Sequence, residues 1–221
     1  IVDRNNRRIA ALLPSLQHLN QLTDLAISLP QVNAVERDSL MHLLSKDRLL
    51  SLNLVHCSMN AELCSALPFS RMKQLRQLCI VDSIIDDDAG FDVCLRSTHD
   101  LQLHSFMLNN VTLSATHMNT LCEGIAQWRN LSELFLENIL PSSYEVSHIL
   151  LLHFLLMHSL HLPQQQGIHH SLMNAIARCT ALQRISLSSM HIDDSIVADL
   201  CEMLNTLSEM KGVYLAGNDM T

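Results

Sequence analysis

The sequence predicts an α/β solenoid in which each repeated unit contributes one short strand and one helix. Three observations support this. An apolar pattern of the form L-x-x-L-x-L recurs along the chain, a polar residue able to cap a helix follows most copies at a fixed distance, and apolar residues at helical spacing come next. A unit of one short strand and one helix cannot bury its apolar faces alone, so neighbouring units must stack to form one continuous core.

The strands are predicted by the apolar pattern itself. When the first apolar residue of each copy is position one, the copies begin 25 to 28 residues apart, at Leu22, Leu49, Leu75, Leu103, Leu131, Met157, Leu182 and Met210. Positions four and six are also apolar in every copy, as at Leu52 and Leu54. Alternation with a period of two is typical of a strand with one buried face. We therefore expect a short parallel strand in each unit.

The helices are predicted by position twelve. Asn, Asp, Ser and Thr side chains accept a hydrogen bond from the free backbone N–H groups at the start of a helix. All but one of the residues at this position are of these types: Asn33, Asn60, Asp86, Ser114, Ser142, Ile168, Asp193 and Thr221. Positions nineteen and twenty are mostly apolar, as at Leu121 and Cys122, and form one face of a helix. A helix is therefore expected after each cap.

We interpret residues 1–221 as a single domain of such repeats. Residues 1–21 hold a partial N-terminal repeat, because Leu12, Leu13 and Leu16 have helical spacing, and the repeat that begins at Met210 is incomplete. We therefore expect the chain to be part of a longer protein. The units beginning at 131 and 157 are the least regular, and we expect a distorted loop over residues 163–167.

Composition excludes several classes of function. The net charge is −8 and no basic run is present, so binding to nucleic-acid phosphates is not expected. The longest apolar run, over residues 149–157, is shorter than the roughly 20 residues of a membrane span. The seven cysteines include no C-x-x-C pair, and most occupy core positions. This favours free thiols in a reduced, cytoplasmic protein.

No metal site, cofactor or catalytic set is expected. The four histidines between residues 148 and 161 are spaced by five, five and three residues, which does not place three imidazoles on one helix face. The run Asp86-Asp87-Asp88 resembles a fragment of a calcium loop, but it lacks the alternating ligands, so helix capping explains it better. We therefore predict that the chain is not an enzyme.

Units of 25 to 28 residues with a full helix resemble leucine-rich repeats of the ribonuclease-inhibitor type. This resemblance implies a horseshoe with parallel strands on the concave face and helices on the convex face. The stretch 49–67, with Cys57 and Cys64, is similar to the repeats of NLR proteins, the nucleotide-binding leucine-rich-repeat innate immune receptors. Position nine, often Asn or Cys in this family, is Asn or Cys only at Cys57 and Asn218, so we expect the buried polar ladder to be mostly absent.

The resemblance implies a protein-recognition module, the ligand-sensing or autoinhibitory part of a cytosolic NLR-like receptor. The stretch 179–187, with Cys179 shortly before a predicted strand, also resembles the substrate-receptor repeats of F-box-type ubiquitin ligases. A regulator or inhibitor of another enzyme is a third possibility. In each case the partner is a protein or another domain of the same parent chain.

The binding residues are expected on the concave face. Positions three, five and seven point away from the buried positions four and six, so they should be exposed there. Aromatic and Met side chains at such places are frequent binding anchors. The candidate partner-binding residues are at position five, with acidic neighbours: Met107, Phe135, His161, Tyr214, Glu133 and Glu137. We expect Met107, Phe135 and His161 to lie on adjacent strands.

Overall fold

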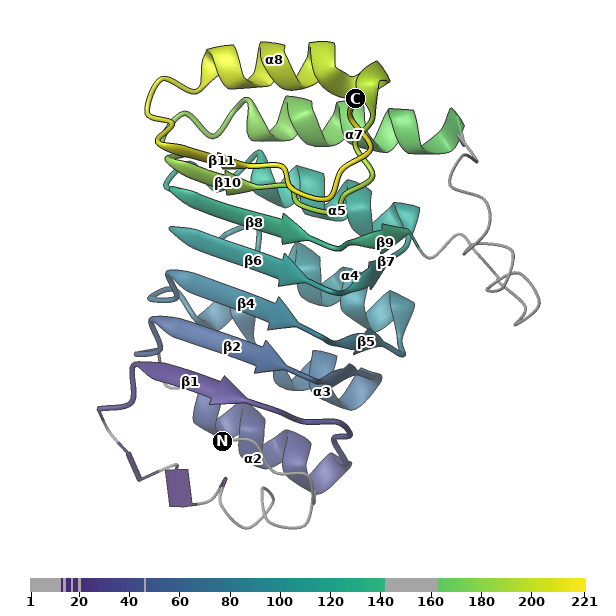
Figure 1. Cartoon of the computed structure of the whole chain (residues 1–221). Helices are drawn as coiled ribbons and strands as arrows, with labels where there is room; N and C mark the ends of the chain where they lie inside the picture. The colour runs from purple at the N-terminus through teal and green to yellow at the C-terminus, as the bar shows by residue number, and fades with distance from the viewer. Residues whose placement is uncertain (1–12, 14, 17, 20, 46, 142–162) are drawn as a thin grey trace, which may run out of the picture.

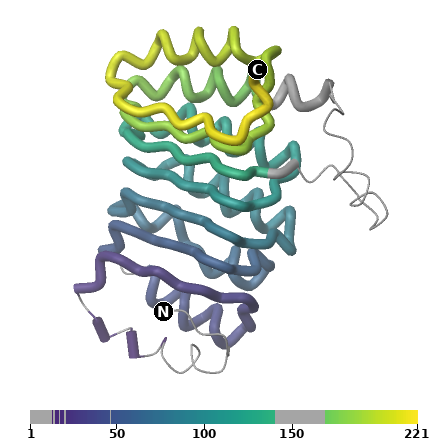
Figure 2. Tube along the Cα trace, viewed as in Figure 1, coloured from purple at the N-terminus to yellow at the C-terminus, as the bar shows by residue number. Residues whose placement is uncertain are grey.

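The chain is built as two layers, a parallel sheet and a row of helices that covers one of its faces (Figure 1). The computed structural model describes residues 13, 15–16, 18–19, 21–45, 47–141 and 163–221. Within this part of the chain, seven strands form the sheet, and successive strands in the sequence are neighbours in space. The trace therefore advances by one strand and one helix with each turn, as the tube in Figure 2 shows.

The strands of the main sheet begin where the apolar pattern predicts them. Their order is β1 (Asp24–Ile27), β2 (Ser51–Val55), β4 (Gln77–Val81), β6 (Ser105–Asn109), β8 (Glu133–Glu137), β10 (Arg184–Ser186) and β11 (Gly212–Tyr214). Equivalent positions of neighbouring units pair, so Leu78 faces Phe106 and Phe106 faces Leu134. Short strands after the turn form two further pairs, β3 (Ser58–Met59) with β5 (Ile84–Ile85), and β7 (Thr112–Leu113) with β9 (Leu140–Pro141).

The helices begin at polar caps, as expected for most units. The α-helices are α2 (Ala34–Leu44), α3 (Ala61–Ala66), α4 (Asp88–Arg96), α5 (Ala115–Ile125), α7 (Pro163–Ile176) and α8 (Val197–Thr206), with 3-10 turns at η1 (Phe69–Arg71) and η2 (Asp194–Ile196). The side chains of Asn33, Asn60 and Ser114 accept backbone N–H groups of the first turns of α2, α3 and α5. Asp193 caps η2 in the same way.

One predicted cap is displaced. The residue before α4 is Asp87, and its side chain makes no capping hydrogen bond. The carboxylate of Asp86 instead accepts a hydrogen bond from the Ser58 hydroxyl of the preceding unit. The acidic run therefore ties two units together at this point, in addition to placing Asp88 in the first turn of α4.

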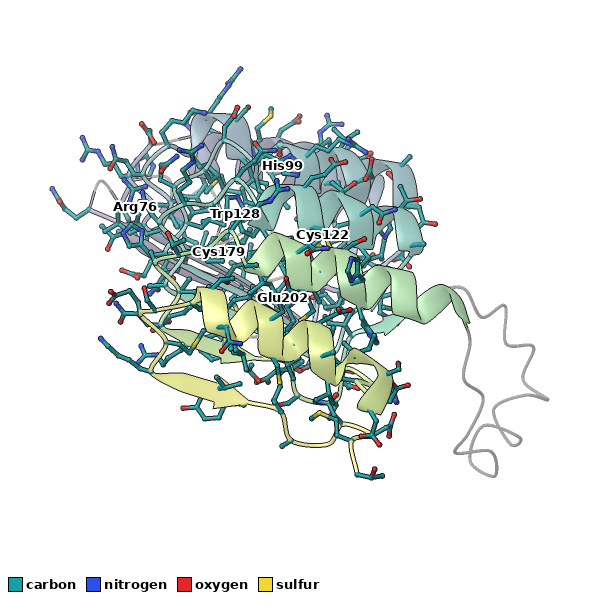
Figure 3. The ribbon with its side chains drawn as sticks, turned by 90° about the horizontal axis from the view of Figure 1, so that it is seen from above. Arg76, His99, Cys122, Trp128, Cys179 and Glu202 are labelled. Atoms are coloured by element: carbon teal, nitrogen blue, oxygen red, sulfur yellow. The ribbon has the colours of Figure 1, made fainter. Side chains whose placement is uncertain are left out.

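The core lies between the two layers and is continuous along the stack. Leu52, Phe106 and Leu134, at position four, are fully buried, and helix residues such as Leu121 pack against them. Trp128 is also buried (Figure 3); its ring lies 4.7 Å from that of Phe106, and its indole N–H donates to the Thr98 carbonyl at 3.0 Å. This hydrogen bond satisfies the one polar group that the indole brings into the core.

The unit predicted to begin at Met157 does not supply a strand between its neighbours. Strand β8 pairs directly with β10, with Leu134 opposite Ile185. Helix α7 packs against α5 on one side and α8 on the other, so it is the helix of the unit that begins at Leu131. Residues 142–162, which include the predicted cap Ser142 and the predicted strand, lie outside the described residues.

The loop expected over residues 163–167 is also wrong, because α7 begins at Pro163 and runs through Ile168, the residue expected at the cap position. Proline is favoured in the first turn of a helix, since its missing N–H would have no partner there and its fixed φ suits the helix. The Gln-rich stretch that looks like an irregular turn is therefore the opening of a regular helix.

Candidate protein-binding face

The residues of position five form a row across the sheet. Cys79 pairs in register with Met107, and Met107 with Phe135. Adjacent strands lie about 4.8 Å apart, so these three side chains are near neighbours on the face that the helices do not cover. The prediction that Met107 and Phe135 lie on adjacent strands is confirmed. All three side chains are half-buried.

The place expected for His161 is taken by another residue. Ser186 of β10 is opposite Phe135, and Tyr214 of β11 follows Ser186. His161 lies outside the described residues, and the direct pairing of β8 with β10 leaves no strand between them to carry it. Tyr214 is 53% exposed, the most open of the predicted aromatic anchors, but it is separated from Phe135 by the small polar Ser186.

Two valines extend the row of position five into an apolar strip. Val55 and Val81 occupy position seven of β2 and β4, where they pair in register beside Cys79. Burial raises the pKa of the Cys79 thiol, which therefore remains a neutral, apolar group. We define the apolar strip as the part-exposed side chains Val55, Cys79, Val81, Met107 and Phe135. Sequence reasoning missed the valines, although the period of two places position seven on this face.

The two predicted acidic residues of β8 differ in their surroundings. The Glu133 carboxylate forms an ion pair with Arg184, and this hydrogen bond raises the pKa of the guanidinium. Glu137 instead accepts hydrogen bonds from the Asn109 amide at 2.8 Å and from the Ser186 hydroxyl at 2.6 Å. Neutral donors hold a carboxylate in place without cancelling its charge. The charge of Glu133 is thus balanced, whereas Glu137 presents an oriented negative charge.

A ladder of polar side chains runs beside the strip at position eight. The Asn138 amide donates to the Asn110 side-chain oxygen at 2.9 Å, and the Asn110 amide donates to the Asp82 carboxylate at 2.7 Å. The other carboxylate oxygen of Asp82 lies 3.7 Å from the His56 ring nitrogen Nδ1. We call His56, Asp82, Asn110 and Asn138 the polar border. The polar border lies next to Glu137, so polar and charged side chains line the strip at the carboxyl ends of the strands.

The backbone explains which residues form the polar border. Each of its four members has a positive φ, between 49° and 53°. Ser189 and Gly217 of the later units share this conformation, with φ of 53° and 72°. Asn, Asp and Gly adopt the left-handed region more readily than most residues. The signal was present at position eight of the sequence, where sequence reasoning did not search for turn residues.

Position nine has fewer polar side chains than position eight, but Ser83 and Asn218 at this position each donate and accept hydrogen bonds. Ser83 accepts the backbone N–H of Cys57 at 3.1 Å and donates to the Val81 carbonyl at 2.9 Å. The Asn218 amide oxygen accepts two backbone N–H groups, of Met190 and Ile192, and its nitrogen donates to two carbonyls. These bonds satisfy the backbone where the chain turns from strand to helix.

The histidines considered as metal ligands have other contacts wherever they belong to the described residues. Among the residues that the structure describes, no three His, Cys, Asp or Glu side chains come together in a way that could hold a metal ion. His169 is buried, and burial lowers the pKa of its imidazole; its neighbour His170 contacts Asp199 at 2.9 Å. The histidines from 148 to 161 lie outside the described residues.

All seven cysteines are free thiols, and five of them are buried. Cys57, Cys64, Cys94, Cys122 and Cys179 pack as core residues, and burial raises the pKa of Cys57 to about 11 and that of Cys179 to about 12. None of the described helices is both long enough and apolar enough to cross a membrane.

Comparison with known proteins finds only distant likenesses in structure. No protein-family model matches the sequence, and no curated protein sequence matches it either. The chain is similar in structure to a leucine-rich-repeat protein of Leptospira interrogans, with 12% identity over 100% of this chain and 72% of that protein, at a TM-score of 0.33. It is also similar to internalin C2 of Listeria monocytogenes, with 14% identity over 63% and 87% of the two chains, at a TM-score of 0.26.

At these values the fold rests on the geometry of the chain itself. Parallel strands recur in register, most helices start at a polar cap, and a left-handed residue follows six of the seven strands of the main sheet at the same position. The chain is therefore an α/β leucine-rich-repeat solenoid, with its strands on the concave face and its helices on the convex face.

Proposed function

We propose that this chain is a protein-recognition module that binds its partner on the concave face, around Met107 and Phe135. The observation that supports this is the apolar strip, a group of part-exposed side chains on the sheet face that the helices leave open. An apolar centre with a polar rim is the usual anatomy of a protein interface, and aromatic and Met side chains are enriched there. No chemical step is proposed.

The finer role that we propose is that of the ligand-sensing or autoinhibitory part of a cytosolic NLR-like receptor. The support is the repeat length together with Cys57 and Cys64, which pack in the core as the NLR-like pattern implies. Core packing of five thiols also suits a reducing compartment. In such a receptor, the concave face would contact either the ligand or the nucleotide-binding module of the same chain.

A second role, as the substrate-receptor repeats of an F-box-type ubiquitin ligase, is favoured by Cys179. Its thiol is buried just before β10 and donates to the Ile125 carbonyl at 3.3 Å. Regulation of another enzyme by the same face is the third role. All three share binding through the concave face, so one experiment tests their common premise.

The test compares two double variants that add the same charge to different faces. Peptides selected from a displayed random library against the wild-type protein are measured against Phe135→Glu with Tyr214→Glu, and against Val35→Glu with Val93→Glu. Val35 on α2 and Val93 on α4 are 76% and 67% exposed on the convex face, so this variant is a matched control. We expect the concave variant to lose at least about tenfold in affinity, because a buried charge replaces an anchor, and the control to bind as the wild type does.

Melting temperature separates loss of binding from loss of folding. We expect both variants to melt close to the wild-type Tm, since none of these side chains is fully buried. Equal binding of the selected peptides by the concave variant and the wild type would contradict the proposed function. A fall in Tm confined to the concave variant would show that Phe135 or Tyr214 supports the core instead.

A further inference from the structure

We infer that the partner segment is an amphipathic helix with basic residues along one flank, lying across β4, β6 and β8. In this arrangement its apolar side chains rest on the apolar strip, and its Lys or Arg residues face Asp82 and Glu137. The inference rests on the proposed function, because it names the kind of partner that the same face accepts. Backbone pairing, spacing and charge each contribute a separate argument.

The backbones of β4, β6 and β8 are already paired on both sides, so a partner on this face must be recognised through side chains. Strand β4 pairs with β2 and β6, β6 with β4 and β8, and β8 with β6 and β10. These strands therefore have no free edge to which an extended peptide could add as a further strand. A helix satisfies its own backbone hydrogen bonds, so it can lie on a face that offers only side chains.

Spacing favours a helix over an extended peptide. The row from Cys79 through Met107 to Phe135 runs across the strands, with a step of about 4.8 Å. A helix presents one face every turn, about 5.4 Å, whereas an extended chain presents the same side about every 6.7 Å. Over the two steps of this row a helix accumulates about 1 Å of mismatch, and an extended chain nearly 4 Å.

The carboxylates of Asp82 and Glu137 determine on which flank of the partner helix the basic residues lie and how far apart they are. Asp82 follows the last residue of β4, and Glu137 is the last residue of β8. Both therefore lie at the carboxyl ends of strands that are two steps apart in the sheet, which corresponds to about 10 Å across the strands. Helix residues seven apart lie on one face at about 10.5 Å. Neutral amide and hydroxyl donors contact both carboxylates, Asn109 and Ser186 for Glu137 and Asn110 for Asp82. The second oxygen of Asp82 lies 3.7 Å from the His56 ring, so Glu137 is the carboxylate with neutral donors alone among its hydrogen-bond partners described above.

The opposite border does not offer the same attraction. At position three of β4 and β6 the residues are Gln77 and Ser105, and on β8 Glu133 is already paired with Arg184. A cation there would meet neutral groups or the Arg184 guanidinium. The asymmetry between the borders therefore orients the helix, with its basic flank toward the carboxyl ends of the strands.

The experiment uses three synthetic peptides of about 15 residues, long enough for a stable helix to be designed. All carry the same leucine stripe. The first has two lysines seven residues apart on one flank, the second has glutamates at those two places, and the third is the lysine peptide with two interior residues replaced by proline. Binding to the whole chain is measured by fluorescence anisotropy, and circular dichroism checks the helix content of each peptide.

We expect the lysine peptide to bind about tenfold more tightly than the glutamate peptide, as two surface ion pairs replace two like-charge contacts. The preference should narrow when NaCl is raised from about 50 to about 500 mM, because salt screens exposed charges. The proline peptide should bind at least about tenfold more weakly, since proline removes the helix.

The matched variants remove charge while keeping shape. In Asp82→Asn with Glu137→Gln the lysine preference should fall to within about twofold, because the ion pairs are lost. The control, Glu123→Gln with Glu202→Gln, removes two exposed charges from the convex helices α5 and α8 and should leave the preference unchanged. Tm measured for both shows whether either change disturbs the fold.

The outcomes separate this inference from the proposed function. Equal binding of the lysine and glutamate peptides, a preference that survives Asp82→Asn with Glu137→Gln, or tight binding of the proline peptide would overturn the inference. If those peptides nonetheless lose affinity for Phe135→Glu and not for Val93→Glu, the proposed function stands. If every peptide binds Phe135→Glu and Val93→Glu with the same affinity, both the proposed function and the inference of a helical partner fail.

Discussion

Leu134 and Phe135 are consecutive apolar residues of β8, but they belong to different regions of the molecule. Leu134 is 0% exposed and packs between the sheet and the helices, whereas Phe135 is half-buried on the concave face. The same contrast holds along β6, where Phe106 is buried and Met107 is part-exposed. Hydrophobicity alone therefore does not distinguish core from binding surface here. The alternation of the strand does. The first prediction below tests this separation directly, and the others test features at the rim of the strands and in the helices.

The largest expected effect is the loss of a core side chain. Leu134→Ala should lower the free energy of unfolding by about 2–5 kcal/mol, because it removes buried methyl groups and leaves a cavity. Urea denaturation measures the change. Phe135→Ala, one residue along, should cost clearly less, although it removes a larger side chain. Equal losses would break the distinction between the two faces.

A smaller effect is expected where the backbone turns at the polar border. Asn110 has a φ of 53°, and β-branched residues are strongly disfavoured in that region. Asn110→Val should therefore cost about 1–2 kcal/mol, whereas Asn110→Gly should cost less, since glycine adopts positive φ freely. Thermal unfolding compares the two variants. A valine variant as stable as the glycine variant would argue against a left-handed residue there.

The helix caps should contribute about 1 kcal/mol each. Ser114 accepts the His117 backbone N–H at 3.1 Å, and the His117 ring in turn accepts the Ser114 N–H at 3.3 Å. Ser114→Ala should lower the free energy of unfolding by about 1 kcal/mol. Ser97→Ala, a hydroxyl near the end of α4, serves as the control, and we expect a smaller loss in the same urea titration.

The smallest effect is a dependence of stability on pH. Burial lowers the pKa of His169 from 6.5 in the folded chain, although the nearby Asp193 carboxylate acts in the opposite direction. Between that lowered pKa and about 6.5 the unfolded chain binds more protons, so stability decreases as the pH falls through this window. His169→Gln should flatten the dependence measured by urea titrations at several pH values. An unchanged slope would mean that other groups cause it.

The sequence predicted the elements whose signals are local. Asn33, Asn60 and Ser114 were identified as caps because a cap depends on residues within one turn. The strands follow from alternation within six residues. The prediction that a strand from Met157 lies between β8 and β10 was wrong, because three apolar residues satisfy that short pattern easily in a chain that is 48% hydrophobic. Whether a strand joins the sheet depends on pairing, and β8 pairs with β10 across 51 positions, from Glu133 to Arg184.

The binding face was predicted only in part for the same reason. Met107 and Phe135 were placed correctly, since the alternation of their own strands fixes position five and the two strands pair in register. His161 was placed beside them only because the unit at 157 was assumed. The polar border was missed because the residue type at position eight varies from unit to unit, so its signal is weaker than that of the apolar positions. Glu137 could not be distinguished from Glu133 before their hydrogen-bond partners were known.

The left-handed turn has a consequence for how this surface can change over evolution. One backbone conformation accepts His56, Asp82, Asn110, Ser189 and Gly217 at the same place in successive units. Residues with an imidazole, a carboxylate, an amide, a hydroxyl or no side chain thus occupy the same place without a new fold. Substitutions at position eight can therefore change the charge pattern of the polar border in one unit at a time. Such changes would alter which partner is bound while the fold of the solenoid stays the same.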